Sequence, residues 1–272
     1  MIRIATLLFL ILSSFSPILS ADLKTLRDAL ERYSADVRGE IGIALIADGR
    51  DTLTVGDCDI YPLMSVFKLH QAVALCHELD RRGIPLDTLL IIRRDDLDPD
   101  TWSPMLTEQP DGDLNLSAAR LMRYALEQSD NNASNILFDR LLGVHKTDSI
   151  IARILPRDSF ALNFREADMK RDNPLSYANH SSPLAVALLL EYLYGDPTAE
   201  DAPVQLSSDS RDFICEALLR CATGRDRIAE GLPDDPAIKI AHKTGSGYRT
   251  RDGLLIAHND SARITLPDGR HY

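Results

Sequence analysis

Several features that would assign a function at once are scarce in this 272-residue sequence. Basic residues are outnumbered, with 30 Lys and Arg against 41 Asp and Glu, so the formal net charge is −11. This acidity argues against nucleic acid or an anionic membrane as a partner. The seven histidines include no His-x-His or His-x-x-x-His pair, so we predict no metal site and no cofactor.

Long apolar runs are also lacking after the N-terminus. Arg3 precedes the apolar residues Ile4 to Leu12, and small residues follow up to Ser20-Ala21. This pattern is typical of a secretory signal peptide at residues 1–20. A membrane anchor is the alternative, but Pro17 and several serines interrupt the run before the roughly 20 apolar residues that a span requires. We therefore expect an exported protein that leaves the membrane after cleavage.

Cysteine is scarce as well, and the four present are Cys58, Cys76, Cys215 and Cys221. An exported protein meets an oxidising compartment in which disulfides persist. Three full pairings are possible, and the sequence leaves open which of them forms, or whether any does. Cys215 and Cys221 lie six residues apart in a helical pattern, a spacing that does not bring two side chains together.

Hydrophobic periodicity predicts strands near both ends of the chain and helices in the middle. Residues 23–35 show an amphipathic helical pattern, and strands at 41–47 and 52–55 fit a hairpin across Asp48-Gly49-Arg50. Ser117 and Gly83 are a predicted N-cap and C-cap. The other predicted elements are helices at 66–82, 117–127, 131–142, 183–194 and 209–221 and strands at 238–243 and 253–266.

This order of elements predicts a fold with two lobes. Residues 21–62 and 208–272 are expected to form an α/β lobe, in which helices flank an antiparallel sheet. Residues 63–207 are expected to form an inserted all-α lobe. No internal repeat or low-complexity linker interrupts the pattern.

Three polar motifs occur once each, in the order Ser65-Val66-Phe67-Lys68, Ser129-Asp130-Asn131 and Lys243-Thr244-Gly245. Ser-x-x-Lys alone is expected by chance about once in a chain of this length. Taken singly, the motifs are also compatible with a helix N-terminus, a helix cap and a strand end. Their joint presence and order predict a serine acyl-transfer enzyme, because such an enzyme needs a nucleophile, a base and a cation for the acid group of its substrate.

The motif set resembles that of class A β-lactamases and penicillin-binding proteins. The similarity extends over the whole mature chain and is greatest with the divergent PER/VEB-type branch of class A. It implies the serine β-lactamase fold, a monomer, a small-molecule β-lactam as substrate, and a periplasmic or secreted location in a bacterium. The segments that carry it further are Tyr61–His70, Thr101-Trp102-Ser103-Pro104, the loop around Glu166 with Tyr177 and Asn179, and His242–Gly245.

The resemblance also implies roles for individual residues. The roles are Ser65 as nucleophile, Lys68 as acylation base or proton shuttle, Ser129 as proton relay, Asn131 as substrate-amide contact, Lys243 with Thr244 as carboxylate ligands, and Ser246 as the donor whose backbone N–H completes an oxyanion hole with that of Ser65. Independently of the resemblance, Gly245 at the end of a strand is expected to admit close backbone approach by a ligand. Trp102, the only tryptophan, is expected at the rim of the cleft, with a buried core position as the alternative. Arg227 is expected to add positive charge beside Lys243, with a solvated helix position as the alternative.

A β-lactamase differs from a penicillin-binding protein in needing a second base that activates water to release the acyl group. Glu166 resembles the deacylating glutamate of the family, and Asp168 is a rival two residues later. The usual class A pattern has an asparagine four residues after this glutamate, whereas this chain has Lys170. The second ligand of the attacking water therefore stays undetermined.

The leading hypothesis is hydrolysis of the β-lactam amide through a Ser65 acyl-enzyme, which confers resistance, with cephalosporins as expected substrates. A penicillin-binding D-Ala-D-Ala peptidase is the first alternative, and a non-catalytic truncated remnant is the second. The second alternative rests on the end of the sequence, where Ala262–Leu266 reads as a strand and Pro267-Asp268-Gly269 as a turn. Only Arg270, His271 and Tyr272 follow, so the last strand and a C-terminal helix are expected to be missing. Either the sequence is part of a longer one, which we favour, or the protein is naturally shortened.

Overall fold

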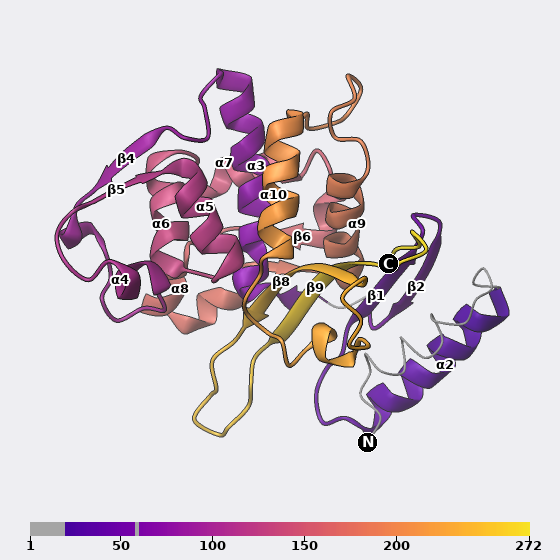
Figure 1. Ribbon diagram of the computed structural model, residues 1–272. Coiled ribbons are helices and arrows are strands. Elements are labelled where there is room, and N and C mark those ends of the chain that lie inside the picture. Colours follow the sequence, from indigo (N-terminus) through magenta and orange to yellow (C-terminus); the bar gives the residue numbers. More distant parts are fainter. Residues whose placement is uncertain (1–19, 58–59) are drawn as a thin grey trace.

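The structure is a computed structural model that describes residues 20–57 and 60–272 (Figure 1). Apart from its last residue, the predicted signal peptide at residues 1–20 lies outside the described residues, as does Cys58. Within the described part of the chain, no helix is both long and apolar enough to cross a membrane.

The predicted helix and hairpin are present as α2 (Ser20–Asp36) and strands β1 (Ile43–Ala47) and β2 (Asp51–Val55), and α2 packs against this hairpin (Figure 1). Asp48 and Gly49 both have positive φ, which lets the two strands reverse within a short turn. Leu26 and Leu30 of α2 are fully buried on this hairpin. Their i,i+4 spacing explains why one face of the helix is apolar.

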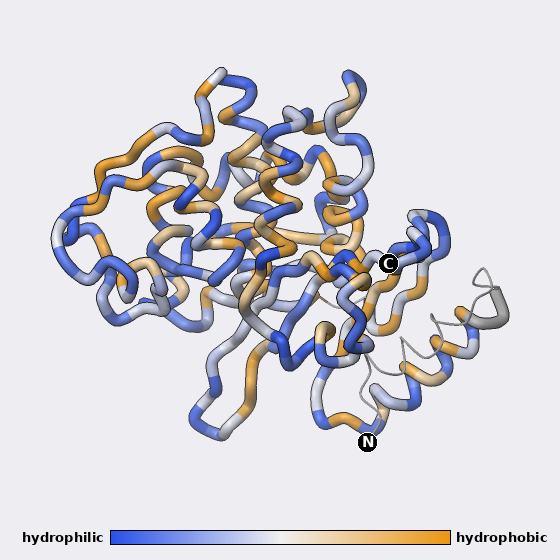
Figure 2. Tube along the Cα trace, viewed as in Figure 1, coloured by the Kyte–Doolittle hydropathy of each residue, from blue (hydrophilic) through white to orange (hydrophobic). Residues whose placement is uncertain are grey.

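Strands β8 (Lys239–Ser246) and β9 (His258–Thr265) form a second antiparallel hairpin, with Lys243 opposite Ser261. The predicted strand at 253–266 begins too early, because residues 247–257 form the connecting loop. Gly253 has a φ of +84° and sits in a turn closed by the Thr250 and Leu254 backbones, so regular pairing stops there. Figure 2 shows hydrophilic residues at the far end of this loop.

The predicted turn after β9 is present, and Leu266 N donates to Arg270 O at 2.9 Å across it. The chain then returns along β9, where Ile264 and Tyr272 exchange both backbone hydrogen bonds, at 2.8 and 2.9 Å. On its other side, His271 O accepts from Asp48 N at the end of β1, at 2.9 Å. Tyr272 is buried in the apolar cluster beneath α2. Residues 270–272 therefore link the two hairpins.

The middle of the chain is mainly helical and surrounds α3 (Figure 1). Its helices are α3 (Phe67–Arg82), α4 (Pro104–Glu108), α5 (Ala118–Glu127), α6 (Asn131–Arg140), α7 (Val144–Ile151), α8 (Glu166–Arg171), α9 (Pro183–Tyr194) and α10 (Ser208–Leu219). The predicted caps are confirmed, since Ser117 Oγ accepts from Arg120 N and Gly83 is left-handed at the end of α3.

Short strands that helical periodicity does not predict also occur in this region. Two antiparallel sheets are formed, one of β4 (Leu89–Ile92) with β5 (Leu114–Ser117), and one of β3 (Tyr61–Pro62), β7 (His180–Ser181) and β6 (Phe160–Ala161). Two-residue strands carry no period that a sequence pattern could reveal. The β3–β7 pairing fastens the chain just before Ser65 to the segment that follows Asn179.

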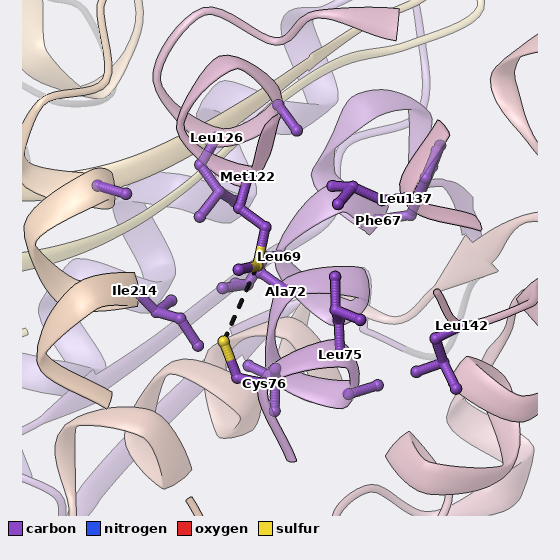
Figure 3. Close-up of a cluster of buried hydrophobic side chains, with 14 of the residues drawn as sticks. Phe67, Leu69, Ala72, Leu75, Cys76, Met122, Leu126, Leu137, Leu142 and Ile214 are labelled. Carbon is purple, nitrogen blue, oxygen red and sulfur yellow. Dashed lines mark hydrogen bonds between the residues drawn. The ribbon is translucent and has the colours of Figure 1, made fainter. Parts of the chain in front are cut away.

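The main apolar core is built on α3, which is buried along most of its length. Figure 3 shows Leu69 and Cys76 of α3 against Met122 of α5, with Ile214 of α10 nearby. Cys76 Sγ lies 3.9 Å from Met122 Sδ. A helix buried on all sides is held from every direction, so the residues at its N-terminus have a fixed position.

Candidate active site

Ser65 lies in a single 3₁₀ turn, η1 (Met64–Val66), that runs directly into α3. The preceding residue Met64 has a φ of +46°, an unfavourable backbone state for a residue with a side chain. This segment is fastened by Asn259 of β9, whose Nδ2 donates to Pro62 O at 2.6 Å and Leu63 O at 3.1 Å. Such strain persists only where surrounding contacts hold it, which is typical of a functional site.

Ser65, Lys68 and Glu166 form one hydrogen-bonded group. The Ser65 hydroxyl donates to Glu166 Oε1 at 2.9 Å and accepts from Lys68 Nζ at 3.1 Å. Lys68 Nζ also lies 2.9 Å from Glu166 Oε1. The serine therefore has both an amine and a carboxylate within reach of its proton.

Lys68 is 1 % exposed and joins the first motif to the second. Its Nζ donates to the backbone oxygen of Ser129 at 2.8 Å and to Asn131 Oδ1 at 2.7 Å. Ser129 has a φ of +59°. Its backbone oxygen accepts from Lys68, while its hydroxyl accepts from Lys243. The structure thus brings Ser65, Lys68, Ser129 and Asn131 together.

Asp130, which lies between Ser129 and Asn131 in the second motif, acts as a helix cap. It is the N-cap of α6, and its Oδ1 accepts from Ala133 N at 2.8 Å. Its Oδ2 accepts from Ser103 Oγ and Met105 N, each at 2.8 Å. Burial raises the pKa of this carboxyl group, and its three donors oppose that shift. These bonds fix the backbone on which Ser129 and Asn131 are carried.

Lys243 joins the third motif to the second. Its side chain is fully buried, and its Nζ donates to Ser129 Oγ at 3.0 Å and to Thr244 O at 2.8 Å. Burial, and then the positive charge of Lys68, lower the pKa of Lys243 to about 7. Below about pH 7, Lys243 therefore places a cation against the Ser129 hydroxyl, where its charge favours transfer of the serine proton to another base.

Gly245 lies where β8 passes closest to the nucleophile. A Cβ on this residue would lie 2.5 Å from Leu63 O and 3.2 Å from Ser65 N, so a side chain would push the strand away. The next residue, Ser246, is the last residue of β8. The end of β8 therefore lies against the backbone at Ser65.

Arg227 lies beside the third motif and is not a solvated helix charge. It precedes the 3₁₀ turn η5 (Ile228–Gly231). Its guanidinium donates to the backbone oxygens of Gly245 and Asn259 and, at 2.6 Å, to Ser246 Oγ. Arg227 therefore bridges the ends of β8 and β9.

Trp102 is 62 % exposed, so the alternative of a core tryptophan is wrong. Its ring N–H donates to Gln128 O at 2.9 Å, one residue before Ser129. Its backbone oxygen accepts from Asn131 N at 3.0 Å. The exposed ring is thus fastened to the segment that carries Ser129 and Asn131.

Glu166 begins α8, and its neighbours anchor this short helix. Asp168 accepts from the backbone and side chain of Arg165 and from Arg171, so both of its carboxylate oxygens are engaged away from Ser65. The Ala167 backbone N–H donates to Asn135 Oδ1 of α6 at 3.2 Å. Of the two candidate carboxylates, only Glu166 contacts the nucleophile in the described residues.

Two residues that the sequence analysis missed complete the site. Asn259 holds the segment before Ser65, as described above. Thr223 Oγ1 lies 2.6 Å from Thr244 Oγ1, and Gly224 allows this approach because a Cβ there would lie 2.4 Å from Thr244 Cγ2. Neither residue belongs to a motif, and only the fold brings them to the site.

A model of the beta-lactamase enzyme family matches residues 24–272. The chain belongs to this family. A beta-lactamase from Phocaeicola vulgatus is 45 % identical over 247 residues, which span 91 % of this chain and 75 % of the relative. The beta-lactamase VEB-1 from Pseudomonas aeruginosa is 30 % identical over 270 residues, which span 97 % of this chain and 86 % of VEB-1. This match confirms the resemblance to the PER/VEB-type branch of class A.

The similarity of this beta-lactamase family member to solved structures confirms the predicted fold class. The crystal structure of the TLA-3 extended-spectrum beta-lactamase superposes with a TM-score of 0.84 at 31 % identity. The match covers 92 % of this chain and 87 % of that structure.

Cys76, Cys215 and Cys221 are free, so none of them pairs with another in the described structure. Burial raises the pKa of Cys76 to about 12, and a smaller contribution comes from the charge of Asp80. Across residues 20–57 and 60–272, no group of three or more His, Cys, Asp or Glu side chains is arranged to hold a metal ion.

Proposed function

We propose that this protein hydrolyses the amide bond of β-lactams through an acyl-enzyme on Ser65, and so confers resistance to them. The observation that carries this proposal is the contact of Ser65 Oγ with both Lys68 Nζ and Glu166 Oε1. Membership of the beta-lactamase family supports it. A deacylating carboxylate in direct reach of the nucleophile favours a hydrolase over a penicillin-binding peptidase, because an acyl-enzyme must also be released.

In the proposed acylation, Ser65 Oγ attacks the lactam carbonyl carbon, and its proton passes to the Lys68 and Glu166 pair. The backbone N–H groups of Ser65 and Ser246 stabilise the oxyanion. The lactam C–N bond then breaks, and Ser129 gives its proton to the leaving nitrogen. Lys243 Nζ donates to the Ser129 hydroxyl, whereas Lys68 Nζ donates to the Ser129 backbone oxygen. The proton that Ser129 gives up is therefore proposed to return to its hydroxyl through Lys243, and the proton taken from Ser65 makes up the balance of the network.

In the proposed deacylation, Glu166 removes a proton from water, and the resulting nucleophile attacks the ester carbonyl carbon. The bond to Ser65 Oγ breaks, and Ser65 recovers a proton from the same network. The product is the ring-opened acid. Glu166 suits this step because its carboxylate lies 2.9 Å from Ser65 Oγ, the oxygen that carries the acyl group, and because α8 holds it there.

The substrate is proposed to be held by groups around this centre. Lys243 and Thr244 bind the carboxylate of the bicyclic ring system, and Arg227 adds positive charge nearby. Asn131 contacts the side-chain amide of the substrate, and the exposed ring of Trp102 stacks at the rim. Cephalosporins are the proposed preferred class.

The finer features of the protein are part of the same proposal. Residues 1–20 are proposed as a signal peptide, which gives a monomeric, periplasmic or secreted enzyme. The proposed lobes are an α/β lobe of residues 21–62 and 208–272 and an all-α lobe of residues 63–207.

The test is hydrolysis of a chromogenic cephalosporin by the full chain, with electrospray mass spectrometry of the reaction. We expect steady turnover that is abolished by Ser65→Ala. Stable acylation of Ser65 without turnover would favour the penicillin-binding peptidase. If the protein folds cooperatively but shows no acylation and no turnover, both the β-lactamase and the penicillin-binding peptidase are excluded.

A further inference from the structure

Lys170 occupies the position where the usual class A pattern has an asparagine, and its ammonium group has a definite partner. It donates to both carboxylate oxygens of Asp98, at 2.8 and 2.6 Å. Lys170 lies one helical turn after Glu166 on α8, so the two side chains share a face of that helix. Lys170 is thus directed toward Asp98 from the same face that carries Glu166.

Asp98 is itself held from the other direction by Asn132 of α6. The Asp98 backbone N–H donates to Asn132 Oδ1 at 3.0 Å, and Asn132 Nδ2 donates to Asp98 O at 2.9 Å. Asn132 is 2 % exposed and directly follows Asn131. This two-point contact makes Asp98 a fixed anchor rather than a mobile surface carboxylate.

These contacts close a ring around the reaction centre. The ring runs through Glu166, Lys170, Asp98, Asn132, Asn131 and Lys68, and it closes where Lys68 Nζ meets Glu166 Oε1 at 2.9 Å. Lys170 with Asp98 joins the helix of Glu166 to the segment that carries the second motif.

We infer that the ion pair of Lys170 and Asp98 is a strap that positions Glu166 for release of the acyl-enzyme. The inference rests on the function proposed above. Before acylation, Glu166 is also held by the Ser65 hydroxyl. An acylated Ser65 has no hydroxyl proton to donate, so Glu166 loses that contact when it must activate water. The strap remains, and deacylation therefore depends on it more than acylation does.

Other contacts among the described residues also hold α8, but none of them joins it to Asp98. Met169 is buried in the main core, and Lys68 Nζ lies 2.9 Å from Glu166 Oε1. Arg165 pairs with Asp139 at 2.5 Å, and Ala167 N–H donates to Asn135, so both fasten the start of the helix to α6. Lys170 fastens the later part of the helix to a different segment. The hydrogen bond from Lys170 also holds the pKa of Asp98 below its usual range, which keeps the pair charged.

Two variants break the strap with little change of shape. Lys170→Met keeps the length of the side chain without its charge. Asp98→Asn keeps an oxygen for the Asp100 N–H, which Asp98 Oδ1 accepts at 2.9 Å. Both strap side chains are partly exposed, so the thermal midpoint should change little.

Asp96→Asn is the matched control. It breaks the 2.9 Å ion pair of Asp96 with Arg140, which joins the neighbouring turn to α6 and also involves partly exposed side chains. That pair lies outside the ring around Glu166.

The experiment measures acylation and deacylation rates separately, by stopped-flow turnover of a chromogenic cephalosporin and by mass spectrometry of quenched samples. We expect Lys170→Met and Asp98→Asn each to slow deacylation about tenfold, with acylation within about twofold of the unsubstituted protein. The double variant should be no slower than either single variant, because both remove the same contact. The Asp96→Asn control should behave as the unsubstituted protein.

Three results would contradict the inference that the ion pair of Lys170 and Asp98 positions Glu166. Lys170→Met could slow deacylation while Asp98→Asn does not, which would mean that Lys170 acts directly on water or substrate. The two effects could multiply in the double variant, or both variants could match the Asp96→Asn control. Absence of turnover by the unsubstituted protein would instead refute the proposed function, so the two failures are distinguishable.

Discussion

The hydroxyl of Ser65 donates its hydrogen bond to Glu166 Oε1 at 2.9 Å, across 101 residues of sequence. The same carboxylate oxygen lies 2.9 Å from Lys68 Nζ, which also lies 3.1 Å from Ser65 Oγ. Nucleophile, amine and carboxylate therefore share one proton network. This arrangement can serve both halves of an acyl-transfer cycle, because a group that accepts the serine proton also adjoins the ester that must be hydrolysed.

Glu166→Gln should separate the two halves of the cycle. Glutamine keeps the shape of the side chain but cannot accept a proton from water, so release of the acyl group should slow about 1,000-fold. Acylation should persist because Lys68 stays in reach of Ser65. Mass spectrometry after mixing with a cephalosporin should show protein with one covalent adduct. Unchanged turnover would exclude Glu166 as the deacylating base.

Asp168→Asn is the matched control for that variant. Asp168 lies on the same short helix, but its oxygens bind Arg165 and Arg171. Loss of this capping interaction should reduce the free energy of unfolding by about 1 kcal/mol. Turnover should continue without accumulation of an adduct. An adduct in this variant that matches the one in Glu166→Gln would mean that the helix, rather than the Glu166 carboxylate, governs release.

The sequence predicts the helices around the site well, because their signals are local. Helix α9 occupies the predicted residues 183–194, and Ser117 and Gly83 cap α5 and α3 as expected. The predicted strand at 253–266 is wrong for residues 253–257, which lie in the loop, since alternating apolar residues do not reveal where tertiary pairing stops.

The motif residues and Glu166 could be selected from the sequence, but their supports could not. Asn259 and Thr223 act through contacts with backbone or side chains distant in sequence, and nothing in their local sequence marks them. Asp98 illustrates the same limit, since its importance depends on Lys170 lying 72 residues further along the chain. Such residues are recognised only when the fold has placed their partners.

The pH dependence of kcat/KM should report the protonation of Lys243. Burial, and then the charge of Lys68, lower the pKa of this lysine to about 7. The group is a cation below that pH and becomes neutral above it, so attraction for the substrate carboxylate decreases as the pH rises. We expect kcat/KM for a cephalosporin to fall above about pH 7, because kcat/KM reflects ionisations of the free enzyme.

Lys243→Arg is the variant that tests this assignment. A guanidinium stays protonated throughout the range, so the fall above pH 7 should disappear even if the activity at pH 7 is lower. As a control for unfolding, samples incubated at each pH are returned to pH 7 and assayed there. Full recovery of activity shows that the fall at high pH reflects ionisation and not unfolding. The same alkaline fall in the arginine variant would assign the ionisation to another group.

Arg227→Lys should weaken the site without removing its charge. The guanidinium binds Gly245 O, Asn259 O and Ser246 Oγ at once, and the single ammonium of lysine cannot reproduce this planar set of donors. The end of β8 should then be held less firmly beside Ser65, and kcat/KM should fall roughly tenfold. Steady-state kinetics of the two proteins provide the measurement. Arg220→Lys, at an exposed pair with Glu216, is the control that should leave kcat/KM unchanged.

Cys221 should react faster than Cys76 with a small alkylating reagent. Burial raises the pKa of its thiol, but the hydrogen bond and charge of His242, with the charge of Lys243, outweigh this and lower the pKa overall. His242 can supply this charge because Asp260 Oδ1 lies 3.1 Å from its Nδ1. Cys76 is fully buried, and burial raises its pKa to about 12.

Iodoacetamide at pH 7.5 followed by peptide mass spectrometry should therefore label Cys221 before Cys76, since the thiolate is the reacting form. His242→Gln should slow labelling of Cys221 and leave that of Cys76 unchanged, because glutamine carries no positive charge. Labelling of Cys221 should also reduce cephalosporin turnover, since its Sγ lies 3.4 Å from Thr223 Oγ1, which contacts Thr244. If Cys76 reacted first, or if His242→Gln left the Cys221 rate unchanged, the charge of His242 would not control this thiol.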